Sequence, residues 1–238
     1  MLLINNIDIS NFKAKLLSRK IKPAKLSNFN SWNKGSLTPF IDNNFFESYK
    51  EIDLEFDILC KNANELETMK SNLISEIKKS ILKFNDINLK YQVFLDGEPD
   101  ISYVMSGNEI LKLKLLGYCF GDEIIENLNK ISNKEITNTG NSKTPVIVEI
   151  VPSIDIIDLT INGLANDPIT IKNLHANKKI IIDGKEGTVT EEGINKFKDT
   201  DFWEFPFLIP GTNAITLSKN SCNVTIKNKE RRNIKCQN

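Results

Sequence analysis

The sequence has few of the residues that build metal sites and nucleophilic active sites. It contains one histidine and four cysteines, which lie far apart and form no CxxC pair: His175, Cys60, Cys119, Cys222 and Cys236. A zinc site needs several of these ligands close together, and a Ser-His or Cys-His pair needs a histidine beside the nucleophile. His175 follows a predicted strand, where an ordinary turn residue is the simpler interpretation. No GxxxxGK[ST] or GxGxxG loop occurs. We therefore predict that the chain is not an enzyme and uses no metal or cofactor.

Other absences restrict the partners and the compartment. Thirty-one basic residues balance 31 acidic ones, so the chain lacks the bulk positive charge that non-specific binding to DNA or to anionic membranes requires. No apolar run approaches the roughly 20 residues of a membrane-spanning helix. Asn5 interrupts the short apolar start, so no secretion signal is predicted. The cysteines are too few and too scattered for a disulfide scaffold, which predicts reduced thiols and synthesis in the cytoplasm.

Two pairs of carboxylates could suggest hydrolysis, namely Asp155 with Asp158 and Asp199 with Asp201. Glycoside hydrolysis uses two carboxylates that face each other across a cleft. Asp155 and Asp158 are three residues apart, which places them on opposite faces of a strand. We interpret both pairs as solvated strand ends and turn caps.

The first half of the chain alternates apolar and polar residues in several stretches and contains one helical pattern. Alternation with period two predicts half-buried strands, and apolar residues at three- and four-residue steps predict a helix. We expect the helix to begin at a capping box of Asn64 and Glu67 and to end near Phe84. The expected strands are a hairpin over residues 2–9 and single strands over 12–16, 51–59, 87–95 and 111–115. Residues 20–44 are polar and irregular, and we expect a long arm there that contacts another molecule through Trp32 and Phe40.

The second half reads as a series of short strands separated by turns. Residues 133–144 are polar and contain Gly140, Asn141 and Ser142 before Pro145, which predicts a linker. The predicted organisation is therefore a domain over residues 1–132, a linker over 133–144 and a domain over 145–238. The expected strands of the second domain cover 146–151, 156–161, 169–174, 179–183, 187–190, 202–209, 214–218 and 222–227. Such regular spacing is typical of an antiparallel sandwich or jelly roll.

The most distinctive stretch lies in this second domain. Asp183-Gly184 forms a hairpin turn, and Trp203, Pro206, Pro210-Gly211 and Asn213 follow at fixed spacing. Pro206 lacks an N–H and fits an edge strand or a bulge, and Pro210-Gly211 suits a type II turn. This run resembles the carboxy-terminal part of distal tail proteins of phages that infect Gram-positive bacteria. The opening residues 4–10 and the helix in the first half are similar to the amino-terminal domain of the same family.

The resemblance implies a mainly β fold of two β-sandwich domains. The first would be a ring-forming belt domain, similar to a tail-tube protein and carrying one α-helix, and the second a galectin-like jelly roll. It implies a structural protein in the baseplate at the virion tail tip of a phage or prophage, made in the host cytoplasm. There, six copies would form a ring with a channel through which DNA passes. The implied partners are the tail tube protein, the hub or tail-associated lysin, and a receptor-binding or baseplate protein. In that family Trp203 would belong to the structural framework of its domain.

One alternative function stays open at this point. Exposed aromatic side chains on β-sandwiches stack on sugars, whereas buried ones fill the core. Trp203 could therefore serve a carbohydrate-binding module that contacts the host cell wall. We favour core packing for Trp203, because it agrees with the resemblance.

Overall fold

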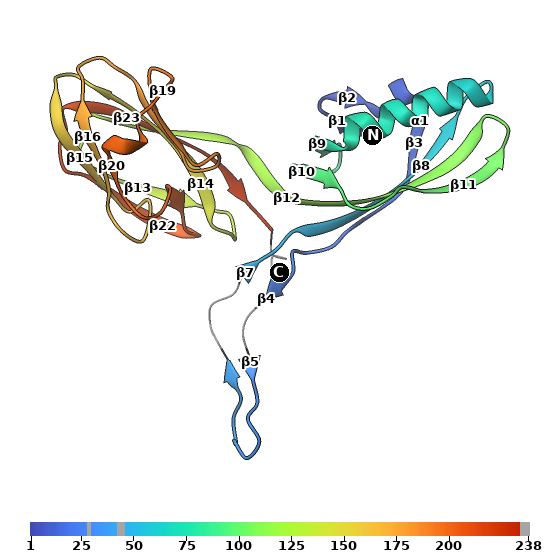
Figure 1. Ribbon diagram of the computed structural model, residues 1–238, viewed down its shortest axis with the longest axis horizontal. Helices are drawn as coiled ribbons and strands as arrows, with labels where there is room; N and C mark the ends of the chain where they lie inside the picture. Colours follow the sequence, from blue (N-terminus) through green and yellow to red (C-terminus); the bar gives the residue numbers. More distant parts are fainter. Residues whose placement is uncertain (28–29, 42–45, 234–238) are drawn as a thin grey trace. The chain divides into compact units, whose positions relative to one another are not determined.

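The computed structural model describes residues 1–27, 30–41 and 46–233. It divides into two compact units, the first formed by Met1–Phe120 with Arg232–Asn238 and the second by Gly121–Arg231 (Figure 1). Both units are built mainly of β-strands, and the described residues contain one α-helix. This confirms the predicted fold class. Cys236 and positions 28–29 and 42–44 of the expected arm lie outside the described residues.

The boundary between the units differs from the predicted one. Residues 133–144, expected to be a linker, contain β13 (Asn133–Asn138), which pairs along its whole length with β22 (Gly211–Leu217). Ile136 and Asn138 of this strand are both buried. The polar composition was misleading, because alternate side chains of a strand at the edge of a sheet face water. The chain instead passes from the first unit to the second within β12 (Asn108–Asn129).

The first unit has an antiparallel core of strands covered by the helix. Its elements are β1 (Leu2–Ile4), β2 (Ile7–Asp8), η1 (Ile9–Phe12), β3 (Ala14–Ile21), β4 (Leu26–Ser27), β5 (Asn30–Ser31), β6 (Phe40–Ile41), β7 (Phe46–Glu47), β8 (Lys50–Leu59), α1 (Ala63–Ile77), β9 (Lys79–Phe84), β10 (Lys90–Leu95), β11 (Asp100–Met105) and the first part of β12. The predicted strands at 51–59 and 87–95 correspond to β8 and β10. The predicted hairpin at the start is β1 and β2, with Asn5 and Asn6 in the left-handed conformation at its turn.

Alternation along β8 explains how this unit folds. Lys50, Ile52, Leu54, Phe56 and Ile58 are buried, and the residues between them are partly exposed. The buried apolar residues of β8 join Leu66, Leu73 and Ile77 of α1 in one hydrophobic cluster. Burying a Phe, Leu or Ile side chain stabilises a fold by about 1.5–3 kcal/mol, so this cluster holds the helix on the sheet.

The helix begins and ends earlier than predicted. Its N-cap is Asn62, whose side chain accepts a hydrogen bond from Glu65 N at 2.9 Å, while the Glu65 carboxylate accepts from Lys61 N. The helix ends at Ile77, and β9 follows with Ser80, Leu82 and Phe84 buried. Ile77 and Ile81 are four residues apart and fit a helix equally well. Pairing of β9 with both β1 and β10 decides in favour of a strand.

The second unit is a sandwich of two sheets, as predicted. One sheet has the order β19-β18-β17-β14-β23-β12 and the other β13-β22-β15-β16-β20. The strands are β14 (Thr144–Pro152), β15 (Ile156–Asn162), β16 (Ile169–Leu174), β17 (Ile180–Asp183), β18 (Thr188–Glu191), β19 (Ile194–Asn195), β20 (Thr200–Asp201), β21 (Phe207–Leu208), β22 and β23 (Cys222–Arg231), with a short η2 (Phe197–Asp199). Both sheets contribute buried Ile, Leu and Val side chains to one cluster. Only Phe207 and Leu208 of the predicted strand 202–209 are a strand, and they pair with β14.

The residues after β23 return to the first unit. The Asn233 side-chain oxygen accepts a hydrogen bond from Cys119 N at 3.1 Å. The Asn233 carbonyl oxygen accepts from Lys50 Nζ at 2.9 Å and from Ala24 N at 3.0 Å. Asn233, Lys50 and Cys119 are all buried. The first unit is therefore built from two segments that are far apart in the sequence.

Candidate functional site

The turn residues of the distinctive motif are used inside the second unit. Val146 N donates a hydrogen bond to the Pro206 carbonyl oxygen at 3.1 Å, and Gly184 N donates to Val146 O at 2.9 Å. A side chain at Gly184 would place its Cβ 2.1 Å from the Pro206 oxygen. Gly184 is therefore required because three backbone segments meet there. Asp183 closes the turn beside it by accepting hydrogen bonds from Lys185 N and Glu186 N.

Asn213 holds the second turn of the motif. Its side chain accepts a hydrogen bond from Ile209 N and donates to Ile209 O and Gly211 O, each at 2.9 Å. Gly211 has a φ of 92°, which fits the second central position of the predicted type II turn after Pro210. Asn213 is buried, so it satisfies backbone groups of the turn that water cannot reach.

Trp203 lies on the surface, which contradicts the prediction that it packs in the core. It is 89% exposed, whereas its neighbours Phe202 and Phe205 pack against the hydrophobic cluster. The Glu204 carboxylate accepts hydrogen bonds from Asn166 N and Nδ2. Phe202 and Phe205 occupy the inward positions of this bend, so the indole between them points outward.

The carboxylates that could have suggested hydrolysis serve local structure. Asp155 accepts a hydrogen bond from Ala176 N, Asp158 pairs with Lys219, and Asp201 pairs with Lys172. Asp199 pairs with Lys196, whose ammonium is buried and lies 3.3 Å from both Asp199 and Glu191. This arrangement agrees with the interpretation as strand ends and turn caps.

His175 joins the same group of charges. Its Nδ1 lies 3.2 Å from Glu191 Oε1. Burial alone would raise the pKa of Glu191, but hydrogen bonds from His175 and Lys196 outweigh it, and the pKa is lowered. Glu191 is therefore held as an anion at the end of β18, between His175 and Lys196.

The described residues offer no other sign of catalytic or metal chemistry. They contain no group of three or more His, Cys, Asp or Glu side chains able to hold a metal ion. Cys60, Cys119 and Cys222 are free thiols, and burial raises the pKa of each. In the same part of the chain, α1 is too short and too polar to cross a membrane.

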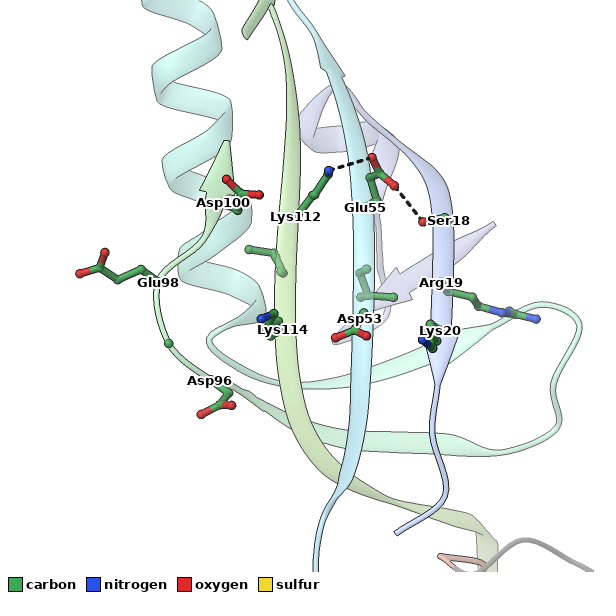
Figure 2. A pocket seen from close by; sticks show the side chains of 13 residues that line it. Ser18, Arg19, Lys20, Asp53, Glu55, Asp96, Glu98, Asp100, Lys112 and Lys114 are labelled. Carbon is green, nitrogen blue, oxygen red and sulfur yellow. Dashed lines mark hydrogen bonds and ion pairs between the residues drawn. The ribbon is translucent and has the colours of Figure 1, made fainter. Parts of the chain in front are cut away.

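The first unit carries a charged, concave surface on the outer face of four strands. This surface encloses about 960 Å³ and is lined by residues of β3, β8, β12 and the turn before β11 (Figure 2). Glu55 of β8 lies at its centre, accepts a hydrogen bond from Ser18 and stands 3.9 Å from Lys112 Nζ. At one end of β8, hydrogen bonds from Lys22 and Lys25 lower the pKa of Glu51 to about 2. Sequence analysis missed this surface, because the cross-strand order of the charges depends on register.

Charge on this surface changes sign from strand to strand. Lys20 of β3 lies opposite Asp53 of β8, which lies opposite Lys114 of β12. Asp96 N then donates to Lys114 O, which places Asp96 beside this row. The next row contains Ser18, Glu55, Lys112 and Asp100 in register. The first row is therefore basic, acidic, basic and acidic in turn, and the second row differs only in having the neutral Ser18 at its β3 position.

Two edges of this four-stranded surface are unpaired in the described part of the chain. β11 pairs with β12 alone, and β3 pairs with β8 alone. All six residues of β11 are exposed, including Tyr103 at 73%. An exposed apolar strand edge invites pairing with another chain.

The expected arm is more ordered than predicted, because β4 pairs with β7 and β5 pairs with β6.

The proposed arm contacts remain on the surface. Trp32 is 67% exposed and Phe40 is 58% exposed. The Trp32 indole N–H donates a hydrogen bond to Ser36 O at 3.1 Å, which fixes the ring against the turn. Leu37 beside this turn is almost fully exposed. Trp32 and Leu37 are therefore available for contact with another molecule.

The second unit, which contains the motif, is similar to a known family of phage tail components. Residues 139–231 match the family model described as "Siphovirus-type tail component, C-terminal domain". The resemblance to phage distal tail proteins is thereby confirmed for this stretch of the second unit. A comparison with curated protein sequences found no match.

Solved structures show the same fold along nearly the whole chain. The crystal structure of the phage SPP1 Dit protein, described as a hub adsorption apparatus of phages that infect Gram-positive bacteria, is similar with a TM-score of 0.75 at 10% identity. The likeness covers 97% of this chain and 98% of that one. The baseplate of phage P2 in its activated conformation with Ca gives a TM-score of 0.52 at 14% identity, over 95% and 96%. The form with Sr gives 0.53 at 14%, over 92% of both chains.

Proposed function

We propose that this chain is a distal tail protein that forms a hexameric ring at the tip of a phage or phage-derived tail. The ring joins the tail tube to the baseplate hub, carries receptor-binding proteins and leaves a channel for DNA. The observation that carries the proposal is the likeness to the hub protein of phage SPP1 over 97% of the chain. The match of residues 139–231 to the tail-component family supports it independently of the fold.

The charge of the chain supports a channel that DNA can pass. Lys and Arg together number 31, as do Asp and Glu. Proteins that grip DNA neutralise phosphates with clustered Lys and Arg, and their binding is strong at low salt. On the charged surface of the first unit, acidic β8 separates the basic strands β3 and β12. Such a mixed surface would let DNA slide without tight binding.

Contact surfaces support assembly with other tail proteins. The hairpin of β5 and β6 exposes Trp32 and Phe40, and aromatic side chains are enriched in protein interfaces. We assign this arm to contacts within the ring or with the tail tube protein. The hub or tail-associated lysin and the receptor-binding or baseplate protein are the other partners. The protein would be made in the host cytoplasm and then built into the virion tail tip.

The mass of the assembled protein tests this function. Light scattering coupled to size exclusion, with negative-stain images of the peak, should show a ring of six copies, alone or after mixing with tail-tube and hub proteins. A variant in which residues 30–41 are replaced by a short Gly-Ser turn should form fewer rings. Only monomers, at high concentration and after mixing with both proteins, would refute the ring.

A carbohydrate-binding role is the second candidate, and the exposure of Trp203 favours it. A freely accessible indole can stack on the apolar face of a sugar ring. Pull-down of the chain on host cell wall tests this role, with Trp203→Ala expected to lose binding. Trp32→Ala is the matched control, because it removes the other tryptophan and leaves the second unit unchanged. Equal retention of the two variants would argue against a sugar site at Trp203.

A further inference from the structure

The strand β11 has the properties of an interface without a partner inside the chain. Its only pairing partner in the described residues is β12, and none of its residues is buried. Ile101, Tyr103, Val104 and Met105 are all at least 44% exposed. A strand with this composition normally has one covered face. An uncovered one is an aggregation hazard unless a partner occupies its edge.

Free charges surround this edge and share one sign. Asp96, Glu98 and Asp100 stand on the turn that leads into β11 and at its first residue (Figure 2). None of the three makes an ion pair with a described residue. No Lys or Arg occurs between Leu95 and Lys112. The β11 edge is therefore acidic as well as apolar.

The opposite edge of the same four strands is basic. From Lys13 to Lys25 the sequence carries six basic residues and no acidic one, namely Lys13, Lys15, Arg19, Lys20, Lys22 and Lys25.

 

Three of these six basic residues are free to meet a partner. Arg19 pairs with Asp86, and Lys22 and Lys25 pair with Glu51. Lys13, Lys15 and Lys20 make no ion pair with a described residue. The outer edge of β3 also has no pairing strand among the described residues. One edge of the surface thus offers three free lysines and the other three free carboxylates.

We propose that copies of this chain associate head to tail, with the acidic β11 edge of one copy against the basic β3 edge of the next. This inference rests on the self-association in the proposed function and names the surfaces that produce it. The charge order supports a second copy as the occupant. Across one chain the row of Lys20, Asp53, Lys114 and Asp96 is basic, acidic, basic and acidic, and a second copy placed this way continues the alternation across the junction.

A symmetric contact between two identical edges does not fit these charges. Two β11 edges would bring Asp96, Glu98 and Asp100 of one copy against the same carboxylates of the other. Two β3 edges would bring lysines together. Like charges placed opposite one another in an interface cost several kcal/mol. The contact is therefore heterologous, which is the type that closes into rings.

Charge reversal at each edge tests the proposal on the full chain. The basic-edge variant carries Lys15→Glu and Lys20→Glu, and the acidic-edge variant carries Glu98→Lys and Asp100→Lys. The matched control carries Lys79→Glu and Lys83→Glu, the same charge change as in the basic-edge variant, at exposed positions of β9. Sedimentation velocity over a concentration series gives the association constant of each, and thermal unfolding of each variant checks that it folds.

Each edge variant alone should associate at least about 100-fold more weakly than the unchanged chain, and the β9 control should associate normally. An equimolar mixture of the two edge variants should recover assembly. When the two variants alternate, every junction is complementary. At one junction an acidic β11 edge meets a basic β3 edge, as in the unchanged chain, and at the next a basic β11 edge meets an acidic β3 edge. Recovery also shows that both variants are folded.

Other outcomes separate this inference from the proposed function. If the unchanged chain assembles and both edge variants assemble equally well, the edges are not the interface, although the ring stands. If both edge variants are folded and monomeric but their mixture stays monomeric, head-to-tail pairing of these edges is wrong. If the unchanged chain is monomeric alone and with its tail partners, both proposals fail. Hydrogen exchange gives a second measure, since amides of β11 should gain protection on assembly and those of β9 should not.

Discussion

The two units use their most distinctive residues in opposite ways. In the second unit, Gly184, Pro206 and Asn213 bring backbone segments together in the interior. In the first unit, Lys20 and the carboxylates from Asp96 to Asp100 line an open surface and make no ion pair with any described residue. The motif on which the family resemblance rests therefore maintains a fold, and the residues of the proposed interface belong to no motif. Substitutions in the second unit should change stability, and those on the first surface should change association.

Gly184→Val should have the largest effect on stability. The new Cβ would lie 2.1 Å from the Pro206 carbonyl oxygen, so the backbone must move and two hydrogen bonds of Val146 and Gly184 are disturbed. We expect a loss of about 3 kcal/mol or more in the free energy of unfolding of the second unit. Urea unfolding measures it. Gly193→Val is the control for a glycine with open space around it, although its φ of 83° adds some strain of its own.

Asn213→Ala should destabilise the second unit by about 2 kcal/mol, because it leaves buried backbone groups of the Pro210-Gly211 turn without partners. Thermal unfolding measures this loss. Asn213→Asp keeps the acceptor for Ile209 N and should lose part of that amount. A stability equal to that of the unchanged chain would show that water replaces the side chain in this turn.

Tyr103→Thr should leave the monomer almost unchanged and weaken association. Tyr103 is 73% exposed, so we expect less than about 0.5 kcal/mol in unfolding free energy. Tyrosine is a frequent hot spot of interfaces, and we expect association about 10-fold weaker in sedimentation velocity. Ile157→Thr, at an 82% exposed position of the second unit, is the control. Normal association of the Tyr103 variant would weaken the assignment of β11 as an interface.

Trp203→Ala should change the unfolding free energy by no more than about 0.5 kcal/mol, because the side chain is exposed and leaves no cavity. The melting temperature and the tryptophan fluorescence check this, since Trp32 is the other tryptophan. A loss of several kcal/mol in the free energy of unfolding would show that Trp203 packs in the core, as the sequence analysis predicted.

The smallest effect concerns pH. Hydrogen bonds from Lys22 and Lys25 lower the pKa of Glu51 to about 2. Because the pKa of Glu51 is lower in the folded state, the ionised Glu51 carboxylate stabilises the fold. This stabilisation is fully present above the unfolded-state pKa of about 4.3 and is lost as pH falls through about 2. Carboxyl NMR should give a midpoint near 2 for Glu51, and Lys22→Ala should raise it. A midpoint that Lys22→Ala does not move would show that the ion pair is absent in solution.

Sequence periodicity predicted much of the fold, because burial on one face produces alternation. The strand 51–59 and the sandwich strands of the second unit were predicted on this basis. It failed where two structures share a pattern, as at Ile77 and Ile81, where only pairing with β1 and β10 decides. It also missed β11, since a strand exposed on all sides has no burial pattern to detect.

The site was less predictable than the fold. The motif was visible as a pattern, but the interior role of Gly184 depends on Pro206, which is remote in sequence. Trp203 was assigned to the core, because aromatic composition does not reveal which member of a bend points outward. The alternating charges of Lys20, Asp53 and Lys114 become a surface only through the register of three strands.

The return of the chain at Asn233 affects the order in which the protein can be made. Cys119 and Asn233 are 114 residues apart, and all of the second unit lies between them. A ribosome must therefore synthesise the second unit before Lys50, Ala24 and Cys119 receive their partner. Until Asn233 has been added, Lys50 Nζ, Ala24 N and Cys119 N lack these hydrogen bonds, so the first unit gains them only after the second unit has been made.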